Sequence, residues 1–337
     1  MNIEEMDKID TKKMYRIYDD WPEIAQQGLE NKPRELQFEN IEHIVFAGMG
    51  GSGLIGDVIS SILSKEKIQV TVVKGYHLPS DLNSKTLVIT ISISGNTKET
   101  LTVLENAKKE NTKIIAFSSG GIMEEFCKKN DIIHQKIQMV HSPRTSFPNF
   151  LFTILNSLRQ IIPIKDEDLK QTIIDLRNTR DSIFSGNLTE ENISLRLSRW
   201  IRNIPLIYYP WGLQAPAIRF KNSLQENSKI HVITEDIIEA CHNGIVSWEK
   251  GSTVQPILIT GSKDYHKTVE VWDILKKFFN KKSIDYFEIK SNDSNVLSKI
   301  VNLIYILDYS SIYHAILNKI DPSPVESIDY FKESLQK

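Results

Sequence analysis

The chain has few cysteines and little net charge, and both shortages narrow the classes of protein that it can belong to. Only two of its 337 residues are cysteines, Cys127 and Cys241, and their separation fits no metal-binding or redox spacing. The formal net charge of -2 at pH 7 gives no sign of a surface built to bind polyanions. We therefore expect no metal site and no nucleic-acid partner, and the scarcity of cysteine fits a reducing cytoplasm.

Long uncharged apolar runs and an ordinary signal peptide are also missing. The run NFLFTILNSL ends at Arg159, short of membrane-spanning length. The first ten residues, MNIEEMDKID, are acidic and polar, unlike a secretory leader. With 40% hydrophobic and 25% charged residues, the composition is that of an ordinary soluble protein. We expect a cytoplasmic protein with no membrane partner.

What the chain does contain is alternation between strand-like and helix-like segments. Its length exceeds one typical core, so two domains are expected. The strand-like runs are rich in Val and Ile and almost continuously apolar, as in a parallel sheet covered on both faces. The first half therefore predicts a doubly wound α/β domain over residues 1–155. Its expected strands are 43–48, 69–73, 87–92 and 113–118, and its helices include 54–65 and 98–110.

The second half predicts a helical connector followed by another α/β unit of the same kind, over residues 156–337. Helical character runs from Phe150 to about Ser198. Beyond it we expect strands at 204–209, 256–260 and 285–289, and helices at 214–227, 266–279 and 295–317. YYPWGLQAPAIRF echoes FAGMGGSGLIGDV, and LITGSKDYHKTVE echoes ITISISGNTKETL, with most glycines and serines lost. The echo suggests a duplicated fold in which the first copy alone kept its polar loops.

Two loops rich in glycine and serine follow hydrophobic runs of the first half, IVFAGMGGSG and LVITISISGNT. Each places small residues and hydroxyls where a strand turns into a helix, and exposed N–H groups there favour an anion. Two such loops on neighbouring strands predict one phosphate group held from both sides. The candidate substrate-binding residues are Gly50, Gly51, Ser52, Ser92, Ser94 and Thr97.

Each loop also has other interpretations. Gly48, Gly50 and Gly53 match the G-x-G-x-x-G dinucleotide fingerprint, but the second strand ends in Lys74 where an acid would bind the ribose. A lysine there could meet a 2′-phosphate, so NADP stays open. Glycines can also serve only a tight turn. In the second loop a hydroxyl could be only an N-cap, yet a cap needs one hydroxyl and this loop has three.

The two loop motifs together resemble the sugar isomerase (SIS) domain, which binds phosphosugars. Further along the chain, SPRTSFP, LQENSK, ACHNGIVSWE and DPSPVESIDYFKESL are similar to segments of the bifunctional phosphoglucose/phosphomannose isomerases of the SIS superfamily. The resemblance spans nearly the whole chain in one order. It implies two SIS-type domains and an aldose–ketose isomerase. That enzyme would interconvert fructose 6-phosphate with glucose 6-phosphate and mannose 6-phosphate through an enediol, and the chemistry requires no metal or redox cofactor.

The resemblance also implies roles for four side chains, each of which has a structural alternative. Glu226 would be the base that moves a proton between C1 and C2, and otherwise it only ends a helix. His242 would assist ring opening from the neighbouring subunit of a homodimer, and otherwise it caps a helix or is a hydrogen-bonded core histidine. Arg144 would stabilise the enediolate, and otherwise it forms a salt bridge. Lys332 would join His242 at the ring oxygen or the anomeric hydroxyl, and otherwise it is solvated.

Two features of this sequence bear on specificity. The resemblance implies Glu after His-Asn in many relatives, where this chain has Gly244; if that acid orients the imidazole of His242, this site is tuned differently or another group replaces the acid. Ser323 and Val325, in DPSPVES, are candidates for distinguishing the glucose and mannose configurations at C2.

Three other functions compete with an isomerase. A phosphosugar-binding SIS regulator would need the loops but not Glu226, His242 and Arg144 together, and the sequence has no evident DNA-binding segment. An NADP-dependent oxidoreductase rests on the glycine fingerprint alone. A glucosamine-6-phosphate synthase would need an N-terminal cysteine nucleophile, which this sequence does not have.

Overall fold

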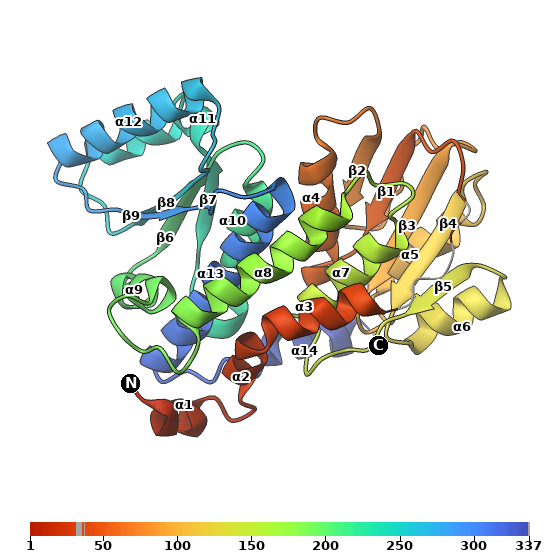
Figure 1. Cartoon of the computed structure of the whole chain (residues 1–337), viewed down its shortest axis with the longest axis horizontal. Helices are drawn as coiled ribbons and strands as arrows, with labels where there is room; N and C mark the ends of the chain where they lie inside the picture. Colours follow the sequence, from red (N-terminus) through yellow and green to blue (C-terminus); the bar gives the residue numbers. More distant parts are fainter. Residues whose placement is uncertain (32–35, 37, 336–337) are drawn as a thin grey trace. The chain divides into compact units, whose positions relative to one another are not determined.

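The computed structural model describes residues 1–31, 36 and 38–335. The chain divides into two units, each built around one parallel sheet (Figure 1). We call them the N-terminal unit, Asp20–Arg177 with Asn295–Ser298, and the C-terminal unit, Met1–Asp19 with Asn178–Ser294 and Lys299–Lys337.

The sheet of the N-terminal unit has five parallel strands in the order β2-β1-β3-β4-β5. Every residue of β1 and β3 is buried, which explains their continuous apolar sequences. The strands are β1 (His43–Ala47), β2 (Gln69–Val73), β3 (Thr86–Ser92), β4 (Lys113–Ser118) and β5 (Ile133–Lys136).

Helices pack on both faces of this sheet, as expected for a doubly wound domain. Val45 and Ala47 of β1 join a buried cluster with Val103 of α5, and Leu104 of α5 joins Met123 of α6 in a second one. Because neighbouring side chains of a strand alternate, Phe46 points to the other face, where it lies against α4. The helices are α3 (Trp21–Glu30), α4 (Gly51–Leu63), α5 (Lys98–Ala107), α6 (Gly121–Lys129) and α7 (Phe147–Ser157), and α8 (Asp166–Ile183) continues into the C-terminal unit.

The sheet of the C-terminal unit has four parallel strands in the order β7-β6-β8-β9. This order repeats the order β2-β1-β3-β4 of the first sheet, so the internal echo in the sequence corresponds to a repeated topology. The strands are β6 (Pro205–Tyr209), β7 (Ile233–Asp236), β8 (Gln255–Thr260) and β9 (Phe287–Lys290).

One buried cluster of the C-terminal unit is rich in aromatic side chains. Tyr208 of β6, Trp248, Trp272 and Phe279 belong to one buried cluster, and the indole of Trp248 donates to the Tyr208 hydroxyl over 2.9 Å. The helices of this unit are α1 (Ile3–Ile9), α2 (Met14–Asp19), α9 (Ile193–Trp200), α10 (Gln214–Ser228), α11 (Ile237–Ala240), the 3₁₀ helix η1 (Gly244–Glu249), α12 (His266–Lys281), α13 (Val296–Leu317) and α14 (Glu326–Ser334).

The helix α13 is long and apolar enough to span a membrane by length and composition, which the sequence analysis did not anticipate. In the structure, however, 89% of its most apolar window is buried. Tyr305, Tyr309 and Tyr313 of α13 are fully buried, and their hydroxyls donate to acceptors elsewhere in the unit. Burial and these hydrogen bonds identify α13 as a core helix.

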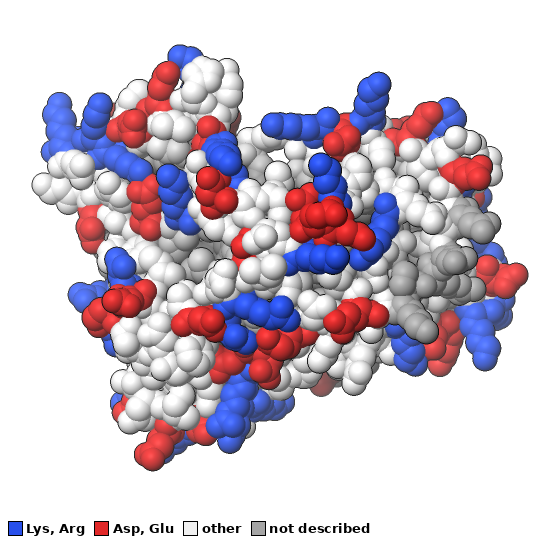
Figure 2. Space-filling view, viewed as in Figure 1, with Lys and Arg blue, Asp and Glu red and all other residues white. Residues whose placement is uncertain are grey.

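The predicted fold class is confirmed, and each predicted strand and helix corresponds to an element of the structure. Two strands, β5 and β7, were not predicted. Both lie at a sheet edge, and their residues are mostly half-buried or exposed, so they lack the apolar run that marks the central strands. Figure 2 shows acidic and basic side chains interspersed on the face drawn, in line with the small net charge.

Candidate active site

The two polar loops lie side by side at the carboxyl edge of the N-terminal sheet. The first joins β1 to α4 and the second joins β3 to α5, and β1 pairs directly with β3. The chain leaves β1 toward β2 on one side and later returns to β3 on the other, so the loops flank the topological switch point of the sheet. Ligands of open α/β sheets bind in this position.

The first loop requires glycine at two positions for different reasons. A Cβ at Gly48 would lie 2.9 Å from the carbonyl carbon of Ser52 and 3.0 Å from the carbonyl oxygen of Ile91, so the backbone approaches too closely for a side chain. Gly50 has φ +53°, which favours glycine. Within the described part of the chain, α4 has no side-chain N-cap, and the amides of Ser52 and Gly53 donate to the carbonyl of Met49 over 3.0 and 3.3 Å, so an anion here would meet the positive end of the helix dipole.

The second loop is a network of hydroxyls. The amide of Gly95 donates to Ser92 Oγ over 3.1 Å, and Ser92 Oγ donates to Thr97 Oγ1 over 3.0 Å. Thr97 occupies the N-cap position of α5, but among the described residues its side chain makes no capping hydrogen bond. Ser92 is buried, Thr97 is half-buried and Ser94 is exposed. The hydroxyls of Ser94 and Thr97 are therefore the more accessible ones, and Ser92 supports the loop from below.

A hydrogen bond joins the two loops. The amide of Ile93 donates to Ser52 Oγ over 3.3 Å, and Ser52 itself is 7% exposed. Ser52 belongs to the first turn of α4 and Ile93 to the second loop, so the two helix N-termini are held in register with each other. One anion placed between them would meet N–H groups and hydroxyls from both sides.

Lys74, the residue on which the NADP alternative depends, is engaged by an acid. Its Nζ lies 2.5 Å from Asp57 Oδ2 of α4. Burial raises the pKa of Asp57, and the charge of Lys74 opposes that shift. The side chain of Lys74 also passes close to Gly53, where a Cβ would lie 3.2 Å from its Cε. Because Asp57 neutralises this lysine, the structure offers little charge there for a 2′-phosphate.

In the second copy of the fold, the loop after β8 is occupied by its own carboxylate. Asp264 Oδ2 accepts the amide of Gly261 over 2.9 Å and the indole N–H of Trp272 over 3.1 Å. A Cβ at Gly261 would lie only 2.1 Å from Asp264 Oδ1. The amide of Gly261, which would otherwise face an external anion in this loop, therefore already binds Asp264.

Arg144 lies in the N-terminal unit, in a turn that hydroxyl groups hold in place. Thr145 Oγ1 donates to the carbonyl of Val140 over 2.7 Å, and the Val140 amide donates to Ser146 Oγ over 2.8 Å. Thr145 and Ser146 are fully buried and Arg144 is 9% exposed. These buried hydrogen bonds hold the backbone on both sides of Arg144 in place.

Glu226 lies in the last turn of α10, and an adjoining face of this helix is fixed to α13 by buried polar groups. Arg219 Nη2 and Nε donate to Asp308 Oδ2 over 2.7 and 2.8 Å, and Ser223 Oγ donates to Asp308 Oδ1 over 2.6 Å. Asn227 Nδ2 donates to Ser311 Oγ over 2.8 Å. The three α10 residues recur every four positions and therefore lie on one face.

On this face of α10, the group with a shifted pKa is Arg219. Burial works against the positive charge of Arg219, but the nearby carboxylate of Asp308 prevails and raises its pKa, and Glu226 adds to the same effect. Glu226 itself is half-buried. It is thus held on a rigid helix with its side chain within reach of solvent or of a ligand.

His242 is exposed in the turn between α11 and η1, and an acid fills the space beside it. A Cβ at Gly244 would lie 2.5 and 2.6 Å from the two carboxylate oxygens of Glu235, a residue of β7. Burial and the nearby charge of Glu239 raise the pKa of Glu235. In the turn that holds His242, where the residue after His-Asn is a glycine, strand β7 therefore supplies a carboxylate, that of Glu235. Because β7 was not predicted, nothing in the sequence indicated Glu235.

Lys332 belongs to α14, a helix with no buried residue among those described. Its neighbours Tyr330 and Phe331 are 68% and 67% exposed. The predicted residues are thus divided between the units: both anion-binding loops and Arg144 lie in the N-terminal unit, and Glu226, His242 and Lys332 lie in the C-terminal unit.

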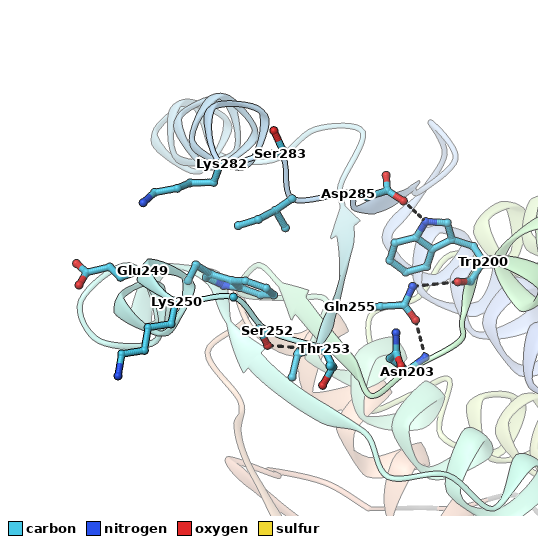
Figure 3. A pocket seen from close by; sticks show the side chains of 14 residues that line it. Trp200, Asn203, Glu249, Lys250, Ser252, Thr253, Gln255, Lys282, Ser283 and Asp285 are labelled. Carbon is cyan, nitrogen blue, oxygen red and sulfur yellow. Dashed lines mark hydrogen bonds between the residues drawn. The ribbon is translucent and has the colours of Figure 1, made fainter.

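A cavity of about 390 Å³ lies elsewhere in the C-terminal unit, at the amino ends of β6, β8 and β9 (Figure 3). Trp200 and Asp285 stand on one side of it, with the indole N–H 2.7 Å from the carboxylate, and Glu249, Lys250 and Lys282 stand on the opposite side. None of the predicted site residues lines this cavity. It is distinct from the candidate active site.

Two family models match the chain, one over each of its two parallel sheets. Residues 37–154 match the SIS domain, and residues 190–335 match the bacterial phospho-glucose isomerase C-terminal SIS domain. The chain is also similar to the solved C-terminal domain of glucosamine-fructose-6-phosphate aminotransferase from Francisella tularensis. The TM-score is 0.67 at 16% identity, over 91% of this chain and 96% of that one. The protein is thus built from two SIS domains.

Curated relatives narrow this class to one family. A bifunctional phosphoglucose/phosphomannose isomerase from Caldicellulosiruptor bescii is 32% identical over 93% of this chain and 96% of its own length. Another with the same name, from Aquifex aeolicus, is 29% identical over 87% of this chain and 90% of its own length. The chain belongs to the family of bifunctional phosphoglucose/phosphomannose isomerases, which confirms the resemblance found in its motifs.

Proposed function

We propose that this protein is an aldose–ketose isomerase that interconverts fructose 6-phosphate with glucose 6-phosphate and mannose 6-phosphate. The observation that carries the proposal is the pair of helix N-termini joined by the Ile93–Ser52 hydrogen bond, in a chain that belongs to this family. The phosphate would bind between the two loops. Fixing one end of the sugar there would leave its carbonyl end to the catalytic side chains.

The proposed reaction moves two protons and needs no redox partner. After ring opening, assisted by His242 and Lys332, the carboxylate of Glu226 takes a proton from C1 of fructose 6-phosphate, and the oxygen on C2 gains one. The resulting enediol or enediolate is stabilised by Arg144. Glu226 then returns its proton to C2 while the oxygen on C1 loses one, which gives the aldose. Because C2 is planar in the enediol, protonation on one face gives glucose 6-phosphate and on the other mannose 6-phosphate.

The first test is an assay of purified protein with fructose 6-phosphate, scored for both aldose products, together with Glu226→Gln. We expect the variant to bind fructose 6-phosphate in a calorimetric titration with unchanged affinity and to lose turnover by about 10²–10⁴-fold, as for removal of a general base. Glu249→Gln, an exposed acid of the same unit outside the proposed site, serves as the control. Near-normal turnover by Glu226→Gln would exclude it as the base.

Binding without turnover by the wild type would instead indicate a phosphosugar-binding regulator. A change in nicotinamide fluorescence on mixing NADPH with the protein would support the oxidoreductase alternative.

We also propose that the protein works as a cytoplasmic homodimer in which His242 completes the site of the partner subunit. The exposure of His242 and the unburied helix α14 support this arrangement. Mixing Glu226→Gln with His242→Asn subunits would then create heterodimers with one intact site. Random exchange would restore about a quarter of wild-type activity. If both residues act within one subunit, no activity returns.

A further inference from the structure

The lysine that ends α10 adopts a backbone conformation that lysine does not favour. Lys229 has φ 58° and ψ 34°, in the left-handed region. Glycine and asparagine are the residues that usually end a helix in this way, and other residues incur a cost of about 1 kcal/mol or more.

The ammonium group of Lys229 joins two segments that are far apart in the sequence. Its Nζ donates to the carbonyl oxygen of Glu226 over 2.5 Å and to that of Pro324 over 2.8 Å. The first is one of the last carbonyls of α10, which the helix itself leaves unsatisfied, and a cation is favoured there. The second lies in the segment Asp321–Val325, between α13 and α14.

The segment Asp321–Val325 is also fixed at its beginning. Thr11 Oγ1 donates to Asp321 Oδ2 over 2.6 Å, and the amide of Ser323 donates to Asp321 Oδ1 over 2.9 Å. Lys229 fixes the segment again at Pro324, directly before Val325. As a result, Ser323 and Val325 are held beside the turn of α10 from which the side chain of Glu226 projects.

We propose that Lys229 is a positioning residue: it sets the place of Glu226 relative to Ser323 and Val325, and so influences which face of C2 receives the proton. The proposal rests on the proposed function. An adjoining face of α10 is already fixed to α13 through Arg219, Ser223 and Asn227. Lys229 contributes a hydrogen bond that ties the end of the helix carrying the base to the segment that follows α13.

The decisive variant is Lys229→Gly, because it should preserve or raise stability through the backbone while it lowers activity through the loss of the side chain. Glycine removes the left-handed strain, so the melting temperature should stay the same or rise. It also removes both side-chain hydrogen bonds. We expect kcat with fructose 6-phosphate to fall about 10-fold or more, since small displacements of catalytic groups have large effects, with KM nearly unchanged. The ratio of glucose 6-phosphate to mannose 6-phosphate formed should change.

The chain supplies a matched control. Lys319 follows α13, has φ +59° and is exposed, but no hydrogen bond of its side chain accompanies this conformation in the described residues. Lys319→Gly should raise or preserve the melting temperature and leave kcat and the product ratio unchanged. Lys229→Arg keeps a cationic donor and should recover part of kcat. Lys229→Asn, which tolerates the left-handed conformation, should behave like Lys229→Gly.

Two results would overturn the inference: unchanged kcat and product ratio in folded Lys229→Gly, or equal losses in Lys319→Gly. Failure of this inference is distinguishable from failure of the proposed function. If the wild type isomerises fructose 6-phosphate and Glu226→Gln does not, but Lys229→Gly is fully active, only the role of Lys229 is wrong. If the wild type itself forms neither aldose, the proposed function is wrong.

Discussion

The backbone of Gly95 lies so close to that of Gly120 that one added methyl group should strongly lower the stability of the protein. In Gly95→Ala, the new Cβ would lie 1.8 Å from the carbonyl oxygen of Gly120 and 2.7 Å from its carbonyl carbon. Real Cβ atoms keep about 3 Å or more from such atoms, so either the second polar loop or the backbone at Gly120 has to move by about 1 Å. The carbonyl of Gly120 cannot move freely, because it accepts the hydroxyl of Ser118 over 2.8 Å.

Two separate costs add in this variant. Gly95 has φ +74°, and a non-glycine residue held in such a conformation costs about 1–3 kcal/mol. Forcing an extra methyl group into a packed region costs about a further 1–3 kcal/mol. We therefore expect Gly95→Ala to lower the free energy of unfolding by about 2–6 kcal/mol, a large part of the stability of a typical protein.

A series of glycine variants separates these costs in urea denaturation. Gly50 has φ +53° with no atom within 4 Å of an added Cβ, so Gly50→Ala should lose only the conformational part. Gly75 has neither the strain nor a neighbour, so Gly75→Ala should be nearly neutral. The reasoning is refuted if Gly95→Ala is no less stable than Gly50→Ala. Because Gly95 donates to Ser92, we also expect weaker binding of fructose 6-phosphate by Gly95→Ala in calorimetry.

Two further predictions concern the C-terminal unit. Asp308→Ala leaves the buried charge of Arg219 without its carboxylate and should lower the free energy of unfolding by about 3–5 kcal/mol in urea, and a loss under 1 kcal/mol would contradict the geometry. Burial lowers the pKa of His314, so the unfolded chain binds a proton that the folded chain refuses, and stability should fall as the pH drops below about 6.5. His314→Asn should flatten this part of the stability profile measured by urea denaturation from pH 7.5 to 5, and an unchanged slope would exclude His314 as its source.

The central strands and both loops could be predicted because their signals are local. β1 and β3 are buried on both faces, so their sequences are apolar throughout, and each is followed directly by small and hydroxylated residues. Edge strands carry a weaker signal. In β7 the sequence ITED is polar because only one side of the strand packs within the sheet, and so its Glu235 was missed along with it.

Site residues known from motifs could be named from the sequence, but their supports could not. Motif similarity was enough to single out Glu226. No sequence pattern indicates that Lys229 reaches Pro324, or that Asp264 closes the second copy of the loop, because both contacts depend on how a side chain is directed after folding.

By itself the sequence determined the alternating α/β architecture, the two anion-binding turns and the family, since each of these follows from neighbouring residues. Tertiary structure decided which distant groups meet. The segment Met1–Asp19 belongs with the C-terminal unit, where Asp19 accepts the hydroxyls of Ser185 and Tyr309. In the same way Asp308, the single acid of the apolar helix α13, forms an ion pair with Arg219 of α10. A buried charge must be paired, but only the folded chain determines by which residue.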